Sequence, residues 1–253
     1  DIDQSSINKN VKVDFHTNTD ITLTLKEINS FIESNNIELE KKDYTNWWSQ
    51  INDWRKKECL HYEQGEETIK PQHAISRLYD LTSQKDTFIT TEVGQHQMWA
   101  AQYYKFSKPN RWITSGGLGT MGFGMPAAVG AQMANPDSLV IDIAGEASFL
   151  MNVQEIATAV QYKLPIKIFI LNNEYMGMVR QWQELLHGSR YSESYVDALP
   201  DFKKLAESFN AVGVRAKNIS ELDDAINEMV SIDRPVIAAV SYTHLRAHET
   251  SAD

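Results

Sequence analysis

Residues 138–178 read SLVIDIAGEASFLMNVQEIATAVQYKLPIKIFILNNEYMGM. This stretch contains two apolar runs, residues 138–144 and 166–172, separated by a segment long enough for one helix. Short, continuously apolar runs that alternate with helical segments are typical of parallel strands buried on both faces of a sheet. The stretch therefore predicts a strand–helix–strand unit of a parallel sheet.

The same alternation continues on both sides of this unit. Pro71 suits the first turn of a helix, because proline lacks the N–H that this turn leaves unpaired. We expect an α/β fold, a doubly wound parallel sheet with helices on both faces. The expected strands are 87–91, 112–114, 138–144, 166–172, 213–215 and 235–240, and the expected helices are 71–82, 95–105, 121–134, 150–162, 176–186, 201–209 and 219–231.

Polar residues follow both apolar runs of the opening stretch. Glu146 comes after the first run and Asn173 after the second. Parallel strands bring their carboxyl ends to one edge of a sheet, where ligands bind, so we expect these two side chains to lie close together. Their oxygens suit a Mg²⁺ ion that also holds phosphate groups. On this pattern alone, both could equally be ordinary loop residues.

A glycine-rich segment, Gly117-Leu-Gly119-Thr-Met-Gly122, lies between an expected strand and an expected helix. The pattern fits the turn of a dinucleotide-binding Rossmann fold, with Asp142 as the acid near the ribose. That acid normally lies about 20 residues further on, at the end of the next strand, whereas Asp142 lies inside an apolar run. A tight glycine turn with close packing is the structural alternative.

Longer segments resemble a known family. The spacing from Gly145 to Asn173 is similar to the GDG…NN motif of thiamine-diphosphate enzymes. The resemblance extends over roughly residues 1–240 and is to the catalytic subunit of the acetohydroxyacid synthases, also called acetolactate synthases. It is carried by TEVGQHQMWAAQYYKF (91–106), RWITSGGLGTMGFGMPAAVGAQMANPD (111–137) and LNNEYMGMVRQWQELLHGSRYSESY (171–195).

The resemblance implies thiamine diphosphate and Mg²⁺ as cofactors. It places the metal on the side-chain oxygens of Glu146 and Asn173 and on the backbone carbonyl of Tyr175. The chain departs from the family here, because the family has Asp at position 146 and usually a further Asp at position 144, where this chain has Ala144. Glutamate is one methylene longer than aspartate, which puts the strength of metal binding in question.

The resemblance also places the cofactor's diphosphate and rings. Helix starts attract anions through exposed N–H groups and the helix dipole, and Gln95, His96 and Ser148 fall at two such starts. A capping or partly buried His96 is the alternative without the resemblance. The expected cofactor-binding residues are Val93, Gly94, Gln95, His96, Gly119, Met121, Gly145, Ala147, Ser148, Asn173, Tyr175, Met178 and Val179.

The resemblance assigns the catalytic posture of the cofactor to two residues. The carbonyl of Gly119 would accept a hydrogen bond from the 4′-amino group, and Met121 would support the bent cofactor beneath its thiazolium ring. A core methionine is the alternative for Met121. Met178 and Trp182 match the family's substrate channel, although their spacing with Val179 is also that of any amphipathic helix.

The implied reaction is the decarboxylating condensation of pyruvate with a second 2-keto acid, pyruvate or 2-ketobutyrate, in branched-chain amino-acid biosynthesis. Expected partners are further copies of the chain in a homodimer or larger homo-oligomer, and a small regulatory subunit. Two alternatives stay open: another thiamine enzyme of the pyruvate oxidase or glyoxylate carboligase type, and a non-catalytic protein of the same fold. We expect residues 1–253 alone to be inactive, because the family's catalytic glutamate lies in a domain with no match here.

The N-terminal part resembles the end of the family's FAD-carrying middle domain. We expect a remnant of that domain over 1–32, a helical connector over 33–70 and the thiamine-diphosphate domain over 71–240. Asp3, Asp20 and Ile21 match positions near FAD, and ordinary acidic loop residues are the alternative. Within these parts we expect a short strand at residues 11–13 and core packing for the tryptophans Trp47, Trp48 and Trp54.

The last thirteen residues, SYTHLRAHETSAD (241–253), do not continue the pattern. They resemble the translation of a sequencing adapter, and we expect a non-native tail; an ordinary polar terminus is the alternative. The net charge of −10 argues against binding nucleic acid through a basic surface. One cysteine, Cys59, excludes an internal disulfide, and we find no signal peptide or apolar run long enough for a membrane. We expect a cytoplasmic protein.

Overall fold

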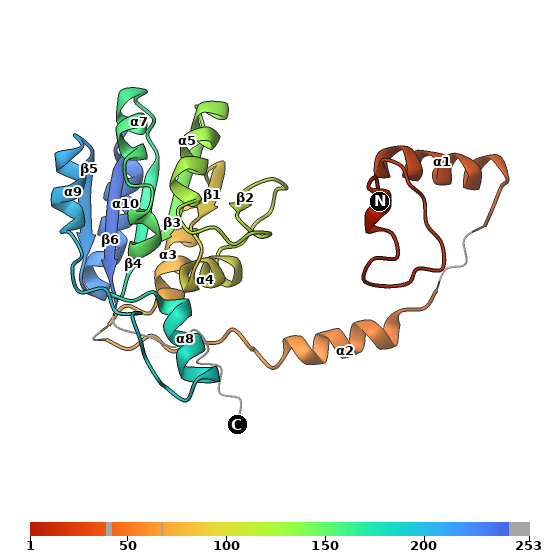
Figure 1. Cartoon of the computed structure of the whole chain (residues 1–253), viewed down its shortest axis with the longest axis horizontal. Coiled ribbons are helices and arrows are strands. Elements are labelled where there is room, and N and C mark those ends of the chain that lie inside the picture. The colour runs from red at the N-terminus through yellow and green to blue at the C-terminus, as the bar shows by residue number, and fades with distance from the viewer. Residues whose placement is uncertain (39–41, 67, 243–253) are drawn as a thin grey trace. The chain divides into compact units, whose positions relative to one another are not determined.

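The computed structural model describes residues 1–38, 42–66 and 68–242. The chain divides into two compact units, residues 1–58 and the part from residue 59 onward. We describe each unit by itself (Figure 1).

The second unit is built on a six-stranded sheet in the order β2-β1-β3-β4-β6-β5. All neighbouring strands are parallel. The strands are β1 (Thr87–Thr91), β2 (Trp112–Thr114), β3 (Leu139–Gly145), β4 (Lys167–Asn172), β5 (Val212–Ala216) and β6 (Val236–Ser241). Most strand residues of β1, β3, β4 and β6 are buried, as expected for a parallel sheet covered on both faces.

Helices cover the two faces of this sheet and form two hydrophobic cores (Figure 1). One face carries α3 (Pro71–Thr82), α4 (Gln95–Tyr103) and α10 (Ile219–Ser231). The other carries α5 (Gly124–Ala134), α6 (Glu146–Leu150), α7 (Glu155–Gln161) and α9 (Phe202–Ser208). This arrangement confirms the expected doubly wound α/β fold. The remaining helix, α8 (Gly177–Leu186), follows β4.

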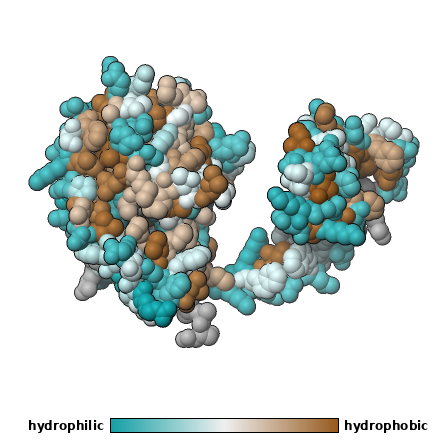
Figure 2. Space-filling model, in the orientation of Figure 1, coloured by the Kyte–Doolittle hydropathy of each residue, from teal (hydrophilic) through white to brown (hydrophobic). Residues whose placement is uncertain are grey.

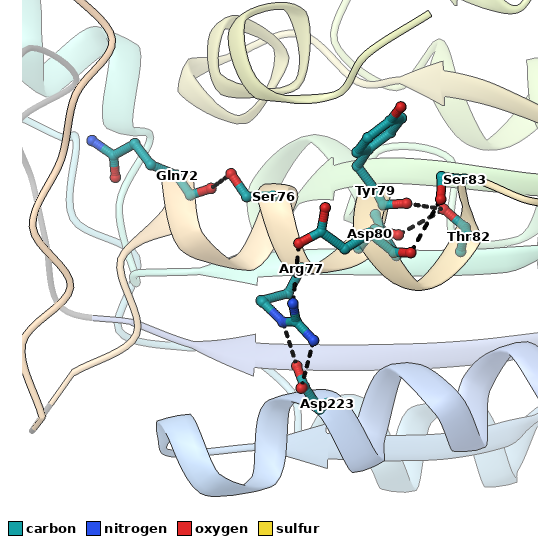
Figure 3. Close-up of polar contacts among 9 residues, drawn as sticks. Gln72, Ser76, Arg77, Tyr79, Asp80, Thr82, Ser83 and Asp223 are labelled. Carbon is teal, nitrogen blue, oxygen red and sulfur yellow. Dashed lines mark hydrogen bonds and ion pairs between the residues drawn. The ribbon is translucent and has the colours of Figure 1, made fainter. Parts of the chain in front are cut away.

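Polar contacts join α3 to α10 at the surface of the first core (Figure 3). Arg77 on α3 binds both carboxylate oxygens of Asp223 on α10, at 2.9 and 2.8 Å, and also reaches Asp80. The two helices lie 146 residues apart in the chain. A bidentate Arg–carboxylate contact of this kind adds geometric specificity to the apolar packing of the two helices.

The helix expected over 150–162 is wrong in its bounds. The chain enters a helix at once after β3, in α6, and a second helix, α7, begins at Glu155. Between them the Asn152 side chain donates a hydrogen bond to the carbonyl of Gly122. This contact fixes the turn between the two helices. The hydrophobic periodicity of residues 150–162 cannot predict it, because Gly122 lies outside that segment.

The end of the sheet also differs from expectation. Ser241, assigned to a tail outside the fold, is the last residue of β6 and pairs with Asn172. Tyr242 is buried, its N–H donates to the Asn172 carbonyl at 3.0 Å, and its ring packs edge-on against Trp99. The rest of the adapter-like segment, residues 243–253, lies outside the described residues.

The first unit contains a 3-10 turn, η1 (Gln4–Ser6), and the helices α1 (Ile21–Ser34) and α2 (Thr45–Arg55). None of the three buries a residue. The strand expected at residues 11–13 is absent from this described segment. The tryptophans of α2 are not core residues, because each is about half exposed, although Trp47 and Trp54 touch edge to face. Hydrophobic and hydrophilic residues mix on the surface (Figure 2).

Candidate functional site

A cavity of about 410 Å³ opens at the carboxyl ends of β1, β3 and β4. The chain leaves β1 for one face of the sheet through α4 and leaves β3 for the other face through α6. Such a reversal opens a crevice between the two strands, and ligands of open α/β sheets bind there. The topology of the sheet therefore accounts for the place of the cavity.

The turn after β1 presents His96 to the cavity between two glycines. A Cβ atom on Gly94 would lie 2.6 Å from the His96 ring, and one on Gly145 would also lie 2.6 Å from it. Only glycine at both positions leaves room for the imidazole. Burial lowers the pKa of His96 to about 3, although its hydrogen bond to the Glu92 carbonyl acts the other way. His96 is therefore a neutral donor or acceptor, not a cation.

The turn after β3 brings Glu146 into the site. Its carboxyl group is buried and accepts a hydrogen bond of 2.9 Å from the Tyr175 N–H. Burial raises the pKa of Glu146 to about 7, against the opposing effect of the backbone N–H groups around it. One residue further, Ala147 lines the cavity, and Ser148 donates its hydroxyl to the Gly145 carbonyl at 3.0 Å.

The turn after β4 brings Asn173 close to Glu146, as the sequence predicts. The Asn173 amide oxygen accepts from the same Tyr175 N–H, at 3.1 Å, that also binds Glu146. Both side-chain oxygens thus lie within 3.1 Å of one nitrogen atom. An antiparallel bridge between Tyr175 and Tyr195 holds this turn from outside, with Met176 donating to the Ser194 carbonyl.

A loop between β2 and α5 forms another wall with Gly119 and Met121. Gly119 and Gly122 have φ angles of +65° and +84°, which favour glycine. The Thr120 N–H donates to the Ser115 hydroxyl, and Asn152 holds the Gly122 carbonyl. The segment that resembles a Rossmann fingerprint is therefore a tight loop at the cavity, and Asp142 lies buried beneath it, not at a strand end.

Helix α8 forms the outer wall. Met178, Val179 and Trp182 line the cavity, and Trp182 remains 59% exposed, so the wall is partly open to solvent. At the start of the helix, a Cβ on Gly177 would lie 2.2 Å from the Gln95 side-chain oxygen. Glycine here allows α8 to approach the turn after β1.

The cavity unites the residues that the sequence assigns to thiamine diphosphate, the metal and the substrate channel. All of them line it: Val93, Gly94, Gln95, His96, Gly119, Met121, Gly145, Glu146, Ala147, Ser148, Asn173, Tyr175, Met178, Val179 and Trp182. The flavin candidates lie in the other unit, where Asp3 and Asp20 cap η1 and α1, and Ile21 is exposed.

Sequence reasoning missed other residues that line the cavity: Leu171, Met176, Gly177, Gln183, His187 and Tyr242. Met176, Gly177 and Gln183 are chain neighbours of the predicted Tyr175, Met178 and Trp182, so their position in the chain was a usable signal. Tyr242 had no such signal, because the sequence around it resembles foreign DNA.

The residues present fit a phosphate ester and a small cation. The His96 Nε2 and Asn173 Nδ2 atoms are buried without a hydrogen-bond partner in the described part of the chain, and such atoms normally have one. No cluster of three or more His, Cys, Asp or Glu side chains among the described residues could hold a metal. A cation here would use one carboxylate, one amide oxygen and backbone carbonyls, a donor set that suits Mg²⁺ when phosphate oxygens complete it.

Comparison with known proteins gives consistent results. The profile of the family "Thiamine pyrophosphate enzyme, C-terminal TPP binding domain" matches residues 92–240, more than half of the chain. The chain is 45% identical over 228 residues to the acetolactate synthase isozyme 3 large subunit of Escherichia coli and 41% identical over 237 residues to the acetolactate synthase large subunit of Haemophilus influenzae.

A similar relative is the mitochondrial acetolactate synthase catalytic subunit of Saccharomyces cerevisiae, 45% identical over 246 residues. These three alignments cover 90%, 94% and 95% of this chain, but only 40%, 41% and 34% of the relatives. The chain thus spans about 40% of the length of the bacterial relatives. No helix among the described residues is long and apolar enough to cross a membrane. The fold, the cavity and the matched profile together show that this chain belongs to the thiamine pyrophosphate enzymes.

Proposed function

We propose that this chain is the cofactor-binding part of an acetolactate synthase. The observation that carries the proposal is the single cavity lined by every residue assigned to the cofactor, the metal and the substrate channel. The acetolactate synthases at 41–45% identity favour this activity over other thiamine enzymes. The substrates would be pyruvate and a second 2-keto acid, either pyruvate or 2-ketobutyrate.

The turns after β1 and β3 would hold the diphosphate. Residues at the starts of α4 and α6 line the cavity, where their backbone N–H groups would donate to anionic oxygens. The neutral His96 ring lines the same cavity and has a buried nitrogen without a hydrogen-bond partner among the described residues. The metal would bind Glu146, Asn173 and the Tyr175 carbonyl and neutralise part of the diphosphate charge.

The loop of Gly119 and Met121 would receive the rings. When bound, thiamine diphosphate supplies the electron sink for decarboxylation and carbon–carbon bond formation. The chain's own part is to hold the bent cofactor, through the Gly119 carbonyl and the Met121 side chain, and to keep water from the reacting centre. Trp182, at the open side, would select the second 2-keto acid through contact area, an effect of about 1–3 kcal/mol.

The wider assembly belongs to the same proposal. We place residues 1–32, with Asp3, Asp20 and Ile21, in a FAD-associated middle domain. The active enzyme would be a homodimer or larger oligomer in the cytoplasm, with a small regulatory subunit as a further partner.

Calorimetric titration of the full chain with thiamine diphosphate and Mg²⁺ tests the proposal. Saturable binding that needs the metal is the expected result. Absence of binding would favour the non-catalytic alternative, which Ala144 and Glu146 motivate. A product assay on an enzyme that contains this segment within the full length of its relatives separates the synthase from other thiamine enzymes, because only the synthase releases 2-acetolactate from pyruvate.

A further inference from the structure

Two carboxyl groups lie fully buried beneath the cofactor loop. Glu92 follows β1, and Asp142 lies in β3. Both residues pack against Gly124, where an added Cβ would lie 2.2 Å from Asp142 Oδ1 and 2.6 Å from the Glu92 backbone nitrogen, and the charge of Glu92 acts on the Asp142 carboxyl. Neither acid makes an ion pair with any described residue. Buried carboxyl groups are costly, so this pair needs an explanation that the cavity lining does not provide.

Glu92 holds three parts of the site together. Its carboxylate accepts a hydrogen bond of 3.0 Å from the Met125 N–H, and the N–H groups of residues 122–124 also stabilise its negative charge. Its own N–H donates to the Ile143 carbonyl of β3, and its carbonyl accepts from the His96 ring. Through Glu92, the start of α5 is tied to β3 and to the cavity histidine.

The environments of the two acids differ. Burial raises the pKa of Glu92, but four backbone N–H groups oppose the effect. Burial raises the pKa of Asp142 well above its ordinary range, the charge of Glu92 raises it further, and only the Thr90 hydroxyl, at 3.0 Å, opposes this. One oxygen of each acid, Glu92 Oε2 and Asp142 Oδ2, has no partner within the described residues. A proton on Asp142 removes one charge and allows it to donate a hydrogen bond.

We propose that Glu92 is a positioning residue for the cofactor. It carries the single negative charge of the Glu92–Asp142 pair, while Asp142 stays protonated. Its carboxylate anchors residues 122–125, so that Gly119 and Met121 keep their place in the cavity wall. The inference rests on the proposed function for its cofactor. The inference concerns the loop that carries Gly119 and Met121, and it assigns no role to the residues proposed to bind the diphosphate or the metal.

The variants Glu92→Gln and Asp142→Asn test the assignment on the full chain. Both keep the shape of the side chain and remove its acidity. Glu92→Gln loses the charge that residues 122–125 bind, so we expect hydrogen exchange of those four amides to speed up at least tenfold. Asp142→Asn replaces a protonated, uncharged carboxyl group by an uncharged amide. It should change the hydrogen-exchange rates of the same four amides less than threefold. No change in Glu92→Gln, or an equal effect in both variants, overturns the proposal.

Ligand titrations separate positioning from general damage. Glu92→Gln should weaken thiamine diphosphate binding at least tenfold, yet leave Mg²⁺–pyrophosphate binding within twofold, because it changes the side chain that binds residues 122–125 and leaves the Glu92 carbonyl, which binds His96, in place. Equal loss of both ligands contradicts a positioning role. If the unaltered chain binds neither ligand, the proposed function fails, and the exchange experiment on the cofactor-free chain still decides the role of Glu92.

Infrared spectroscopy of the unaltered chain at neutral pH provides a test that does not require Glu92→Gln to fold. Glu146, whose pKa is about 7, also contributes to the protonated carboxyl band at this pH, so the test compares the spectra of the unaltered chain and of Asp142→Asn. The band should lose the intensity of one carboxyl group in Asp142→Asn, and an unchanged band overturns the assignment of the proton.

Discussion

At the scale of single residues, Glu146 is the position at which this chain departs from the metal motif that it resembles. The family that this chain resembles has an aspartate here, and a glutamate carboxyl reaches about 1.3–1.5 Å further from the backbone, whereas Mg²⁺ bonds of 2.0–2.1 Å tolerate little error. In the structure the longer side chain still meets Asn173 through the shared Tyr175 N–H. The Glu146 carboxyl group therefore lies beside Asn173, and the length of the Glu146 side chain is the variable that a substitution can test for the proposed metal role.

We expect Glu146→Asp to tighten the joint binding of Mg²⁺ and thiamine diphosphate at least threefold. The shorter carboxylate of aspartate suits the short, strict bond lengths of Mg²⁺. Calorimetry measures the change, with Glu207→Asp on the exposed side of α9 as the matched control. Unchanged affinity in Glu146→Asp would count against a metal role for this residue.

His96 makes stability depend on pH. The pKa of His96 in the folded chain is about 3, below the ordinary value of 6.5. Between pH 3 and pH 6.5, His96 is therefore protonated in the unfolded chain and neutral in the folded chain. His96 should therefore lower stability as the pH drops below about 6.5, by up to about 1.4 kcal/mol per pH unit, whereas Glu146, whose pKa is raised to about 7, has the opposite effect between about pH 7 and 4.5. The contribution of His96 ends near pH 3, where both states are protonated.

Urea unfolding between pH 4.5 and 7 measures this slope. His96→Gln should remove the contribution of His96, so that the stability of the variant relative to the unaltered chain rises as the pH falls, because glutamine does not titrate in this range. His61→Gln, at an exposed position of the same unit, should leave the slope unchanged. Equal slopes for His96→Gln and the unaltered chain would show that His96 is not kept neutral by the fold.

At the scale of elements, α5 shows how closely the sheet approaches its helices. Gly124 starts the helix against β1 and β3, with the Asp142 side chain and the Glu92 backbone in the space that a Cβ would fill. Gly130, two turns later in the same helix, has no atom within 4 Å of an added Cβ. The close packing at Gly124 therefore requires glycine, whereas the open space at Gly130 does not.

We therefore expect opposite effects of alanine at these positions. Gly130→Ala should stabilise the protein by up to about 1 kcal/mol through helix propensity. Gly124→Ala should destabilise it by about 1–3 kcal/mol, because a packed interior does not accept the added methyl group without backbone shifts. Thermal and urea unfolding measure both changes, and a neutral Gly124→Ala would contradict the close approach.

At the scale of the whole molecule, the two units differ in how many of their hydrophobic residues are buried. The second unit has a hydrophobic core on each face of its sheet. The helices of the first unit bury no residue, and Phe15 is 94% exposed. Regions with few buried apolar contacts open at low free-energy cost.

Limited proteolysis should therefore cut residues 1–58 well before the sheet. We expect a resistant product that begins near residue 59 and retains the cavity residues, identified by mass spectrometry. Thiamine diphosphate with Mg²⁺ should slow cleavage in the α8 region and leave cleavage of residues 1–58 unchanged. Cleavage within β3 or β4 at the same rate as in α1 would contradict this difference in stability.

Much of the fold could be predicted from the sequence, because buried parallel strands have a local signature. The predicted ranges of β1, β2, α3 and α10 match the structure residue for residue. The cavity residues could also be named in advance, because they follow strand ends and resemble a known motif. The tryptophans of α2 could not be placed, since apolar spacing shows which side chains share a helix face and not whether anything covers it.

The sequence by itself determined the order of strands and helices, the parallel sheet and the strand ends at which ligands bind, because each of these follows from local periodicity and chain direction. Only the tertiary structure decided that Glu92 and Asp142 form one buried pair, that Asn152 ends α6 by binding Gly122, and that Tyr242 lines the cavity. These contacts join residues far apart in the chain, and their energies depend on burial and charge, which exist only after the sheet has brought its elements together.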